Sequence, residues 1–515
     1  MHRKALFSIF LLITTTKIVL SLFISSPHIV FDESILFIEA QKIWHEHTYF
    51  TGRWLGFPQY PPLYPLLISF TTALPDPEQS FRLILILNSI ISTSAVFPAY
   101  YFAKEYLTEK KSLITTFLVA LYPPGFIYTF TIMCENLFIP LILTSIYFMK
   151  KSFDEDTLRA NTLAGLFLSL SFLTKLTAIP VIVIYIGGKL WQIMADKKRI
   201  RTAIGIILII LTISAYFLAN TIHYSNQPQI TLRSSATGYG TDPIHAPGKD
   251  SLALFFSYIL YLVLAGGGIA FMAFFTEYKR FRLFWLIILT FILFISYAMP
   301  TGMIHGRYLD PFIPLMIIGA LGYQAESKNK RSLLLAFTIS LTALWFFPFF
   351  WMDTINSSAS IYLLNPYIRY TLAIIFSVFF LFLLEARTPW KVSTVIAVTL
   401  LILFLTNNAV NYQFVKTAST NAYEYCKIGR YISEHNLTSI TFDKDDYRDW
   451  WSTYCLINFW SRHFIPLETA TNISSSSRYF ISSKNLSYPV LASEKSFYQL
   501  ENINTTLYLY QKAYK

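Results

Sequence analysis

Residues 5–33 read ALFSIFLLITTTKIVLSLFISSPHIVFDE, an apolar run that ends shortly before two adjacent carboxylates, Asp32 and Glu33. The apolar part, residues 5–24, is about long enough to cross the hydrocarbon core of a bilayer as a helix. Two basic residues precede it, as in a signal peptide, but the run is longer than usual and lacks a small-residue cleavage site. We therefore predict an uncleaved first membrane helix, with an acidic pair just beyond its end.

The composition indicates that the whole chain, and not only its first helix, is typical of a membrane protein. Of the 515 residues, 54% are hydrophobic and only 14% are charged, whereas a soluble protein carries about 25% charged residues. The net charge of +12 does not indicate nucleic-acid binding, because the basic residues form short clusters between apolar runs, where they act as topology signals. The cysteines are too few and too scattered for a metal site or a disulfide framework: Cys134, Cys426 and Cys455. The sequence predicts an all-α polytopic membrane protein.

If successive apolar runs cross the membrane in alternating directions, all the basic clusters lie on the same side of the membrane. This pattern predicts about 13 membrane helices, with the N-terminus inside and the last ~105 residues outside. A long outer loop, residues 25–81, contains a short apolar stretch at 61–74 that we interpret as an interfacial or re-entrant helix. Besides the first helix, we expect membrane helices at 82–103, 112–130, 136–149, 160–173, 176–192, 202–220, 251–275, 283–299, 309–323, 332–351, 367–385 and 392–409.

The tail differs from the rest, so we place a domain boundary between residues 1–410 and 411–515. The tail is polar and has short alternating runs at 439–442 and 506–510, which predict a small outer α/β domain. Four Asn-X-Ser/Thr sequences give weak support for an outer location: Asn436, Asn472, Asn485 and Asn504.

Acidic residues lie at two of the predicted outer turns. Asp32 and Glu33 follow the first helix, where they could be solvated loop residues or carboxylates that act as general bases. Glu135 lies at the outer turn of the first helical hairpin, where the alternative is a helix N-terminus that favours an acid.

Basic residues lie at two further outer turns. Lys175 ends the motif Phe-Leu-Thr-Lys, and an ionisable group at membrane depth is a functional candidate, although a snorkelling lysine is the alternative. Arg307 could bind a phosphate or simply pair with Asp310. His305 is either a polar loop residue or part of a site. Together these turns place acids and bases at one membrane face.

The pattern resembles the GT-C class of polytopic glycosyltransferases, in particular protein O-mannosyltransferases and the bacterial aminoarabinose transferases of lipid A. The predicted helix layout with an outer C-terminal domain is also similar, so the resemblance covers nearly the whole chain. The motifs that carry it are Asp32-Glu33, Gln59-Tyr60-Pro61-Pro62-Leu63-Tyr64, Glu135, Thr174-Lys175 and Arg307-Tyr308-Leu309-Asp310-Pro311-Phe312-Ile313-Pro314.

The resemblance implies roles for these residues. Asp32 would be the general base or an acid that orients the acceptor, with Glu33 supporting it and Glu135 as a second acid. Lys175 and Arg307 would bind the phosphate of the donor. Relatives often have a lysine just before the proline stretch, where this chain has Tyr60, so Arg53 is a candidate substitute. Substrate contacts are expected from Tyr60, Tyr64, His305 and Tyr308.

The chemistry implied by the resemblance is transfer of a hexose-type sugar from a polyprenyl or dolichyl phosphate to an acceptor hydroxyl, with inversion. The acceptor could belong to a protein, a lipid or a glycan. No nucleotide-binding glycine loop is evident, and the first loop has no convincing Asp-X-Asp pair, so we expect no cofactor and no required metal. The expected location is the outer face of the plasma membrane. A transporter or flippase of lipid-linked saccharides and a non-catalytic relative remain alternatives, although no internal repeat supports a transporter.

Overall fold

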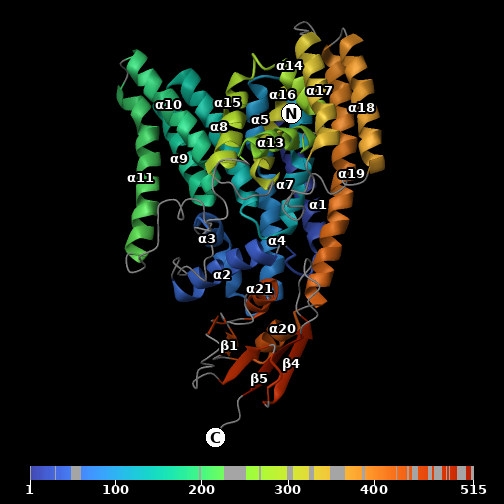
Figure 1. Cartoon of the computed structure of the whole chain (residues 1–515). Coiled ribbons are helices and arrows are strands. Elements are labelled where there is room, and N and C mark those ends of the chain that lie inside the picture. The colour runs from blue at the N-terminus through green and yellow to red at the C-terminus, as the bar shows by residue number, and fades with distance from the viewer. Residues whose placement is uncertain are drawn as a thin grey trace.

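The computed structural model is mostly helical, with a small sheet near the C-terminus (Figure 1). Long helices form a bundle, and the sheet lies beyond one end of it. The structure describes residues 2–28, 30–47, 60–196, 199–224, 251–265, 268–298, 306–323, 330–347, 366–385, 389–424, 426–437, 440–443, 451–461, 465, 467–468, 478–482, 484–486, 488–495 and 506–511.

The first half of the bundle follows the predicted order of helices. Its elements are α1 (His2–Ser21), α4 (Pro77–Thr93), α5 (Val96–Lys104), α6 (Glu109–Leu121), α7 (Pro123–Ile127), η2 (Tyr128–Phe130), α8 (Glu135–Glu155), α9 (Leu158–Thr174), η3 (Leu176–Ala178), α10 (Ile179–Asp196) and α11 (Arg199–Tyr224).

The second half of the bundle ends in the longest helix. Its elements are α13 (Ser251–Ala265), α14 (Ile269–Thr276), α15 (Arg282–Ala298), η4 (Gly306–Tyr308), η5 (Asp310–Phe312), α16 (Ile313–Leu321), α17 (Lys330–Phe346), α18 (Pro366–Glu385) and α19 (Pro389–Glu424). Helix α19 continues beyond the predicted end at 409, and it runs down from the bundle towards the sheet (Figure 1).

Within the described ranges, four helical segments are long and apolar enough to cross a membrane: Arg3–Ser21, Pro77–Lys104, Leu176–Ala195 and Lys391–Tyr423. Two bent pairs would raise this number to six, and several other apolar helices are shorter. These findings support a membrane protein, and the count of 13 spans stays a prediction.

Among the described residues, two of the helices predicted as continuous are bent by more than 40° at a break. The predicted helix 112–130 bends by 56° after α6, where Pro123 and Pro124 lack the backbone N–H groups that would continue it. The predicted helix 251–275 bends by 108° between α13 and α14. Gly268 there has a φ of +65°, a conformation that glycine adopts without strain.

The segment predicted as an outer loop, residues 25–81, contains more structure than we predicted. The stretch 61–74 forms α3 (Leu63–Ser69) and η1 (Phe70–Ala73), in agreement with the predicted short helix. The loop also contains α2 (Val30–Glu46), which the sequence analysis missed. Helix α2 lies across the end of the bundle, between the long helices and the sheet (Figure 1). It packs on the C-terminal part of the chain through the Phe37 and Phe459 rings, whose centroids are 4.4 Å apart.

The C-terminal part combines helices with a five-stranded mixed sheet of order β2-β1-β3-β5-β4. Strand β1 is parallel to β2 and β3, and β5 is antiparallel to β3 and β4. The two alternating runs of the sequence correspond to β1 and β5. The elements are α20 (Lys427–Glu434), α21 (Trp451–Trp460), β1 (Ile440–Asp443), β2 (Leu467–Glu468), β3 (Tyr479–Ser482), β4 (Val490–Lys495) and β5 (Thr506–Gln511).

Candidate functional site

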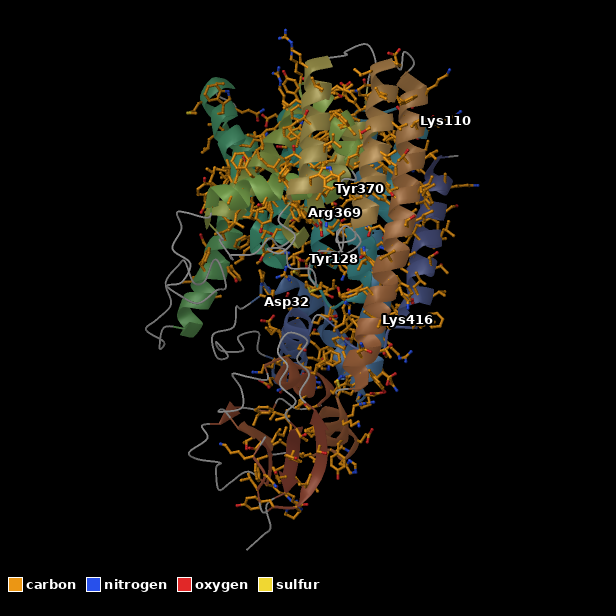
Figure 2. The ribbon with its side chains drawn as sticks, turned by 45° about the vertical axis from the view of Figure 1, so that its right-hand side comes forward. Asp32, Lys110, Tyr128, Arg369, Tyr370 and Lys416 are labelled. Atoms are coloured by element: carbon orange, nitrogen blue, oxygen red, sulfur yellow. The ribbon has the colours of Figure 1, made fainter. Side chains whose placement is uncertain are left out.

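Asp32 lies in the first turn of α2 and is buried, with 4% of its surface exposed. The Tyr60 hydroxyl donates a hydrogen bond to Asp32 Oδ1, and Arg307 Nη1 forms an ion pair with Oδ2. Figure 2 shows Asp32 where α2 meets the bundle. This burial rules out the alternative that Asp32 is a solvated loop residue. Tertiary folding brings Arg307 to Asp32 although 275 residues separate them in the chain.

Glu33 is fully buried and points to a different set of partners. Its Oε2 accepts the backbone N–H of His28 at 2.7 Å, and its Oε1 accepts the backbone N–H of Ile132, also at 2.7 Å. Glu33 therefore ties the start of α2 to the segment that precedes α8. Both of these contacts are with backbone N–H groups, and the predicted support of Asp32 by Glu33 stays a prediction.

A second ion pair joins Glu135 and Lys175. Glu135 is the first residue of α8 and is fully buried, and Lys175 caps the end of α9. Lys175 Nζ donates to Glu135 Oε1. Lys175 is therefore paired and largely buried, with 12% of its side chain exposed; the snorkelling alternative does not describe it.

The Tyr308 ring connects the two ion pairs. Lys175 Nζ is 5.0 Å from the ring centroid, and the central guanidinium carbon of Arg307 is 5.5 Å from it. Both distances are within the range of cation–π attraction. The site thus contains two cations near one aromatic ring, each paired with a carboxylate. Arg307 Nε is buried and has no hydrogen-bond partner among the described residues.

Asp310 is not the partner of Arg307, contrary to the simpler alternative in the sequence analysis. Its Oδ2 accepts the Tyr128 hydroxyl and its Oδ1 accepts the Tyr261 hydroxyl, both at 2.7 Å. Asp310 therefore links η5 to η2 and α13, and leaves Arg307 available to Asp32.

Buried polar residues hold the segment between α6 and α8, where the helix break leaves backbone groups without helical partners. Lys17 Nζ donates to the carbonyl of Gly125 at 3.1 Å, and Asn88 Nδ2 donates to the carbonyl of Thr131 at 2.8 Å. Asn136 Nδ2 donates to three carbonyls of the same segment. A buried polar group is costly unless it is paired, so this network positions Glu135 and the Glu33 contact.

Glu39 is a candidate that the sequence analysis missed. It lies two turns after Asp32 on the same face of α2, and its Oε1 accepts the backbone N–H of Tyr60 at 3.4 Å. Its Oε2 is buried without a hydrogen-bond partner among the described residues. Burial, the main effect, raises the pKa of Glu39 well above its ordinary value. The i to i+7 spacing would have found Glu39 if a helix had been predicted here.

Three other predicted residues contribute nothing to this description of the site. Arg53 and His305 lie outside the described residues. Tyr64 is fully buried, and its hydroxyl donates to Asn88 at 3.0 Å, so it packs inside the protein in this structure. Among the described residues, no group of three or more His, Cys, Asp or Glu side chains could hold a metal ion.

Part of the sequence and the fold of this chain are similar to those of known proteins. Residues 59–223 match the model of the family dolichyl-phosphate-mannose-protein mannosyltransferase. The fold matches crystal structures of ArnT from Cupriavidus metallidurans, bound to undecaprenyl phosphate (TM-score 0.58) and in the apo state (TM-score 0.59), each at 13% identity over 97% of both chains. The predicted resemblance to the GT-C class is confirmed.

The family match and the shared fold indicate a glycosyltransferase, the enzyme class predicted from the sequence. A more distant match is the arabinosyltransferase EmbB from Mycobacterium smegmatis, at 12% identity and a TM-score of 0.46 over 81% of this chain and 41% of that one. A comparison with curated protein sequences gave no significant match.

Proposed function

We propose that this protein transfers a hexose-type sugar from a polyprenyl or dolichyl phosphate to an acceptor hydroxyl at the outer face of the plasma membrane. The observation that carries the proposal is the grouping of Asp32, Glu135, Arg307 and Lys175 around the Tyr308 ring. A glycosyl transfer from a lipid phosphate needs a base for the acceptor and cations for the leaving group, and this group supplies both. The ArnT structure with undecaprenyl phosphate supports a donor of this class.

In the proposed reaction, Asp32 takes the proton of the acceptor hydroxyl as its oxygen bonds to the anomeric carbon. The bond from that carbon to the phosphate oxygen breaks, and the lipid phosphate leaves with the electron pair. Attack opposite the leaving group inverts the anomeric centre. Glu135 serves as a second acid that orients the substrates.

Arg307 and Lys175 would stabilise the charge that grows on the leaving phosphate. In the structure each cation is neutralised by a carboxylate, so a bound phosphate would compete with Asp32 and Glu135 for them. Because these two cations supply positive charge, the proposal calls for no metal ion.

The test compares membranes that contain the unmodified protein, Asp32→Asn or Glu46→Gln. Each is incubated with a polyprenyl-phosphate hexose labelled in the sugar, together with lipid and protein extracts of the native cell. An asparagine oxygen can still accept from Arg307 and its amide can donate to the Tyr60 oxygen, so Asp32→Asn should fold. Glu46→Gln removes a carboxylate from the exposed end of the same helix and is the matched control.

We expect Asp32→Asn to reduce transfer about 100-fold or more, the usual contribution of a general base, and Glu46→Gln to retain activity. Normal transfer by Asp32→Asn would refute the role of Asp32 as the base. Label that stays on the carrier with every variant, across several hexoses, would instead favour a lipid-linked saccharide transporter.

A further inference from the structure

Tyr60 occupies the position at Asp32 that the proposed reaction requires for an acceptor alcohol. Its hydroxyl donates to Asp32 Oδ1, as an acceptor hydroxyl must do before it loses its proton. The other carboxylate oxygen is already engaged by Arg307. With 4% of its surface exposed, Asp32 is shielded from water in this state. An acceptor that approaches Oδ1 must therefore displace the Tyr60 hydroxyl.

The chain around Tyr60 holds its hydroxyl at this place. On one side, the Tyr60 backbone N–H donates to Glu39, so the residue spans the two acids on one face of α2. On the other side follow Pro61 and Pro62, whose rings restrict the backbone. The carbonyl of Pro62 then accepts the N–H of Leu66, and this hydrogen bond is at the start of α3. Tyr60 is thus held on one side by the hydrogen bond to Glu39 of α2 and on the other side by the chain that leads into α3.

We propose that Tyr60 determines whether Asp32 acts on an acceptor alcohol or on water. This inference rests on the proposed function. With the donor bound and no acceptor present, the phenol fills the position of the attacking oxygen and keeps water away from the base. A productive acceptor displaces the phenol and takes over its hydrogen bond. Tyr60 is then a specificity-determining residue, and its position before the proline stretch is used to select the nucleophile.

Removing the phenol hydroxyl opens a second reaction. A water oxygen bonds to the anomeric carbon, the bond to the phosphate oxygen breaks, and the lipid phosphate leaves with the electron pair. The proton lost by water goes to Asp32. The products are the free sugar and the lipid phosphate, and no further reactant is needed.

The experiment measures both reactions with the purified full-length chain in lipid nanodiscs. The probe is a polyprenyl-phosphate hexose labelled in the sugar, supplied alone or with the native cell extract that supports transfer. Tyr60→Phe removes only the hydroxyl. The control is Tyr423→Phe, which removes another tyrosine hydroxyl that faces a carboxylate, that of Glu78 at 3.4 Å, away from Asp32.

We expect Tyr60→Phe to release free sugar without acceptor at least about tenfold faster than the unmodified protein, because one charge-assisted hydrogen bond no longer excludes water. In the presence of the extract, we expect transfer to continue with a lower KM for the acceptor. Tyr423→Phe should leave both rates unchanged. A lower KM together with faster hydrolysis is not expected from general loosening of the fold.

Three outcomes would overturn the inference. Unchanged hydrolysis by Tyr60→Phe would show that the hydroxyl does not exclude water. A higher acceptor KM without hydrolysis would make Tyr60 an ordinary acceptor contact, and one hexose found by mass spectrometry on the peptide that contains Tyr60 would make it an acceptor itself. The proposed function fails separately, if the unmodified protein with the extract transfers no sugar.

Discussion

Replacement of Glu33 should make the protein unfold more easily, because its carboxylate holds two backbone N–H groups in the interior. Glu33 is fully buried, and each of its oxygens accepts a backbone N–H at 2.7 Å, one from His28 and one from Ile132. In Glu33→Ala both donors lose a charged acceptor. A buried donor left without a partner costs about 1–3 kcal/mol, and the loss is larger where the acceptor was charged, so we expect about 3–6 kcal/mol in all.

Glu33→Gln provides an intermediate case. Its amide has a single oxygen, so one backbone N–H keeps an acceptor while the other faces an NH₂ group. We expect about half of the loss in the free energy of unfolding, roughly 2–3 kcal/mol. Glu46→Gln is the control, because it removes a carboxylate from the exposed end of the same helix.

The assay is unfolding of the purified protein in detergent, by heat and by denaturant, for the three variants and the unmodified chain. We expect Glu46→Gln to be about as stable as the unmodified chain, Glu33→Gln to be less stable, and Glu33→Ala to be the least stable. If Glu33→Ala unfolds within about 0.5 kcal/mol of the unmodified chain, the size of a typical surface substitution, the assignment of Glu33 as a structural tie is wrong.

Three further predictions concern the second ion pair, the helix packing and pH. Lys175→Ala should weaken binding of a polyprenyl-phosphate sugar, but it also leaves the Glu135 carboxylate buried and unpaired, which costs about 3–5 kcal/mol. The double variant Lys175→Met, Glu135→Gln should regain stability without regaining donor affinity; full donor binding by it would exclude a phosphate role for Lys175. Gly205→Ala should cost about 1–3 kcal/mol in thermal unfolding, because its Cβ would lie 2.6 Å from a backbone oxygen of α9, whereas Gly187→Ala, whose Cβ meets nothing within 4 Å, should be neutral or stabilising. The raised pKa of Glu39 means that the folded chain holds this proton more tightly than the unfolded chain, so its contribution to stability is lost as pH rises above about 4.5. Glu39→Gln should flatten that part of the curve of stability against pH, and an unchanged curve would contradict the assignment.

The candidate residues were identifiable from the sequence, but most of their contacts were not. Ionisable residues next to apolar runs are unusual enough to indicate Asp32, Glu135, Lys175 and Arg307. Their pairing was not predictable, because 40 residues separate Lys175 from Glu135 and 275 separate Arg307 from Asp32. Asp310, three residues after Arg307, was the obvious local partner. In the structure its carboxylate instead accepts hydrogen bonds from two tyrosine hydroxyls.

The predicted outer loop likewise contains one helix that the sequence predicted and one that it did not. The short helix at 61–74 was predictable because it begins with prolines and is apolar, whereas α2 has charged residues in its first turn and no long apolar run. Helix α2 is stabilised by packing, as the Phe37 contact with α21 illustrates. Without α2, the shared face of Asp32 and Glu39 could not be recognised.

The sequence by itself determined that this chain is a membrane protein of many helices with a polar C-terminal part, because the transfer of side chains out of water depends on local composition. It also indicated which ionisable groups lie next to apolar runs. Only the tertiary structure decided what each of them does. A buried charge or N–H must find a partner in space, and that partner is chosen by how broken helices, α2 and the Tyr60 segment pack together. Asp32 and Glu33 are adjacent in the chain, yet one faces Arg307 and Tyr60 while the other is bound by backbone N–H groups.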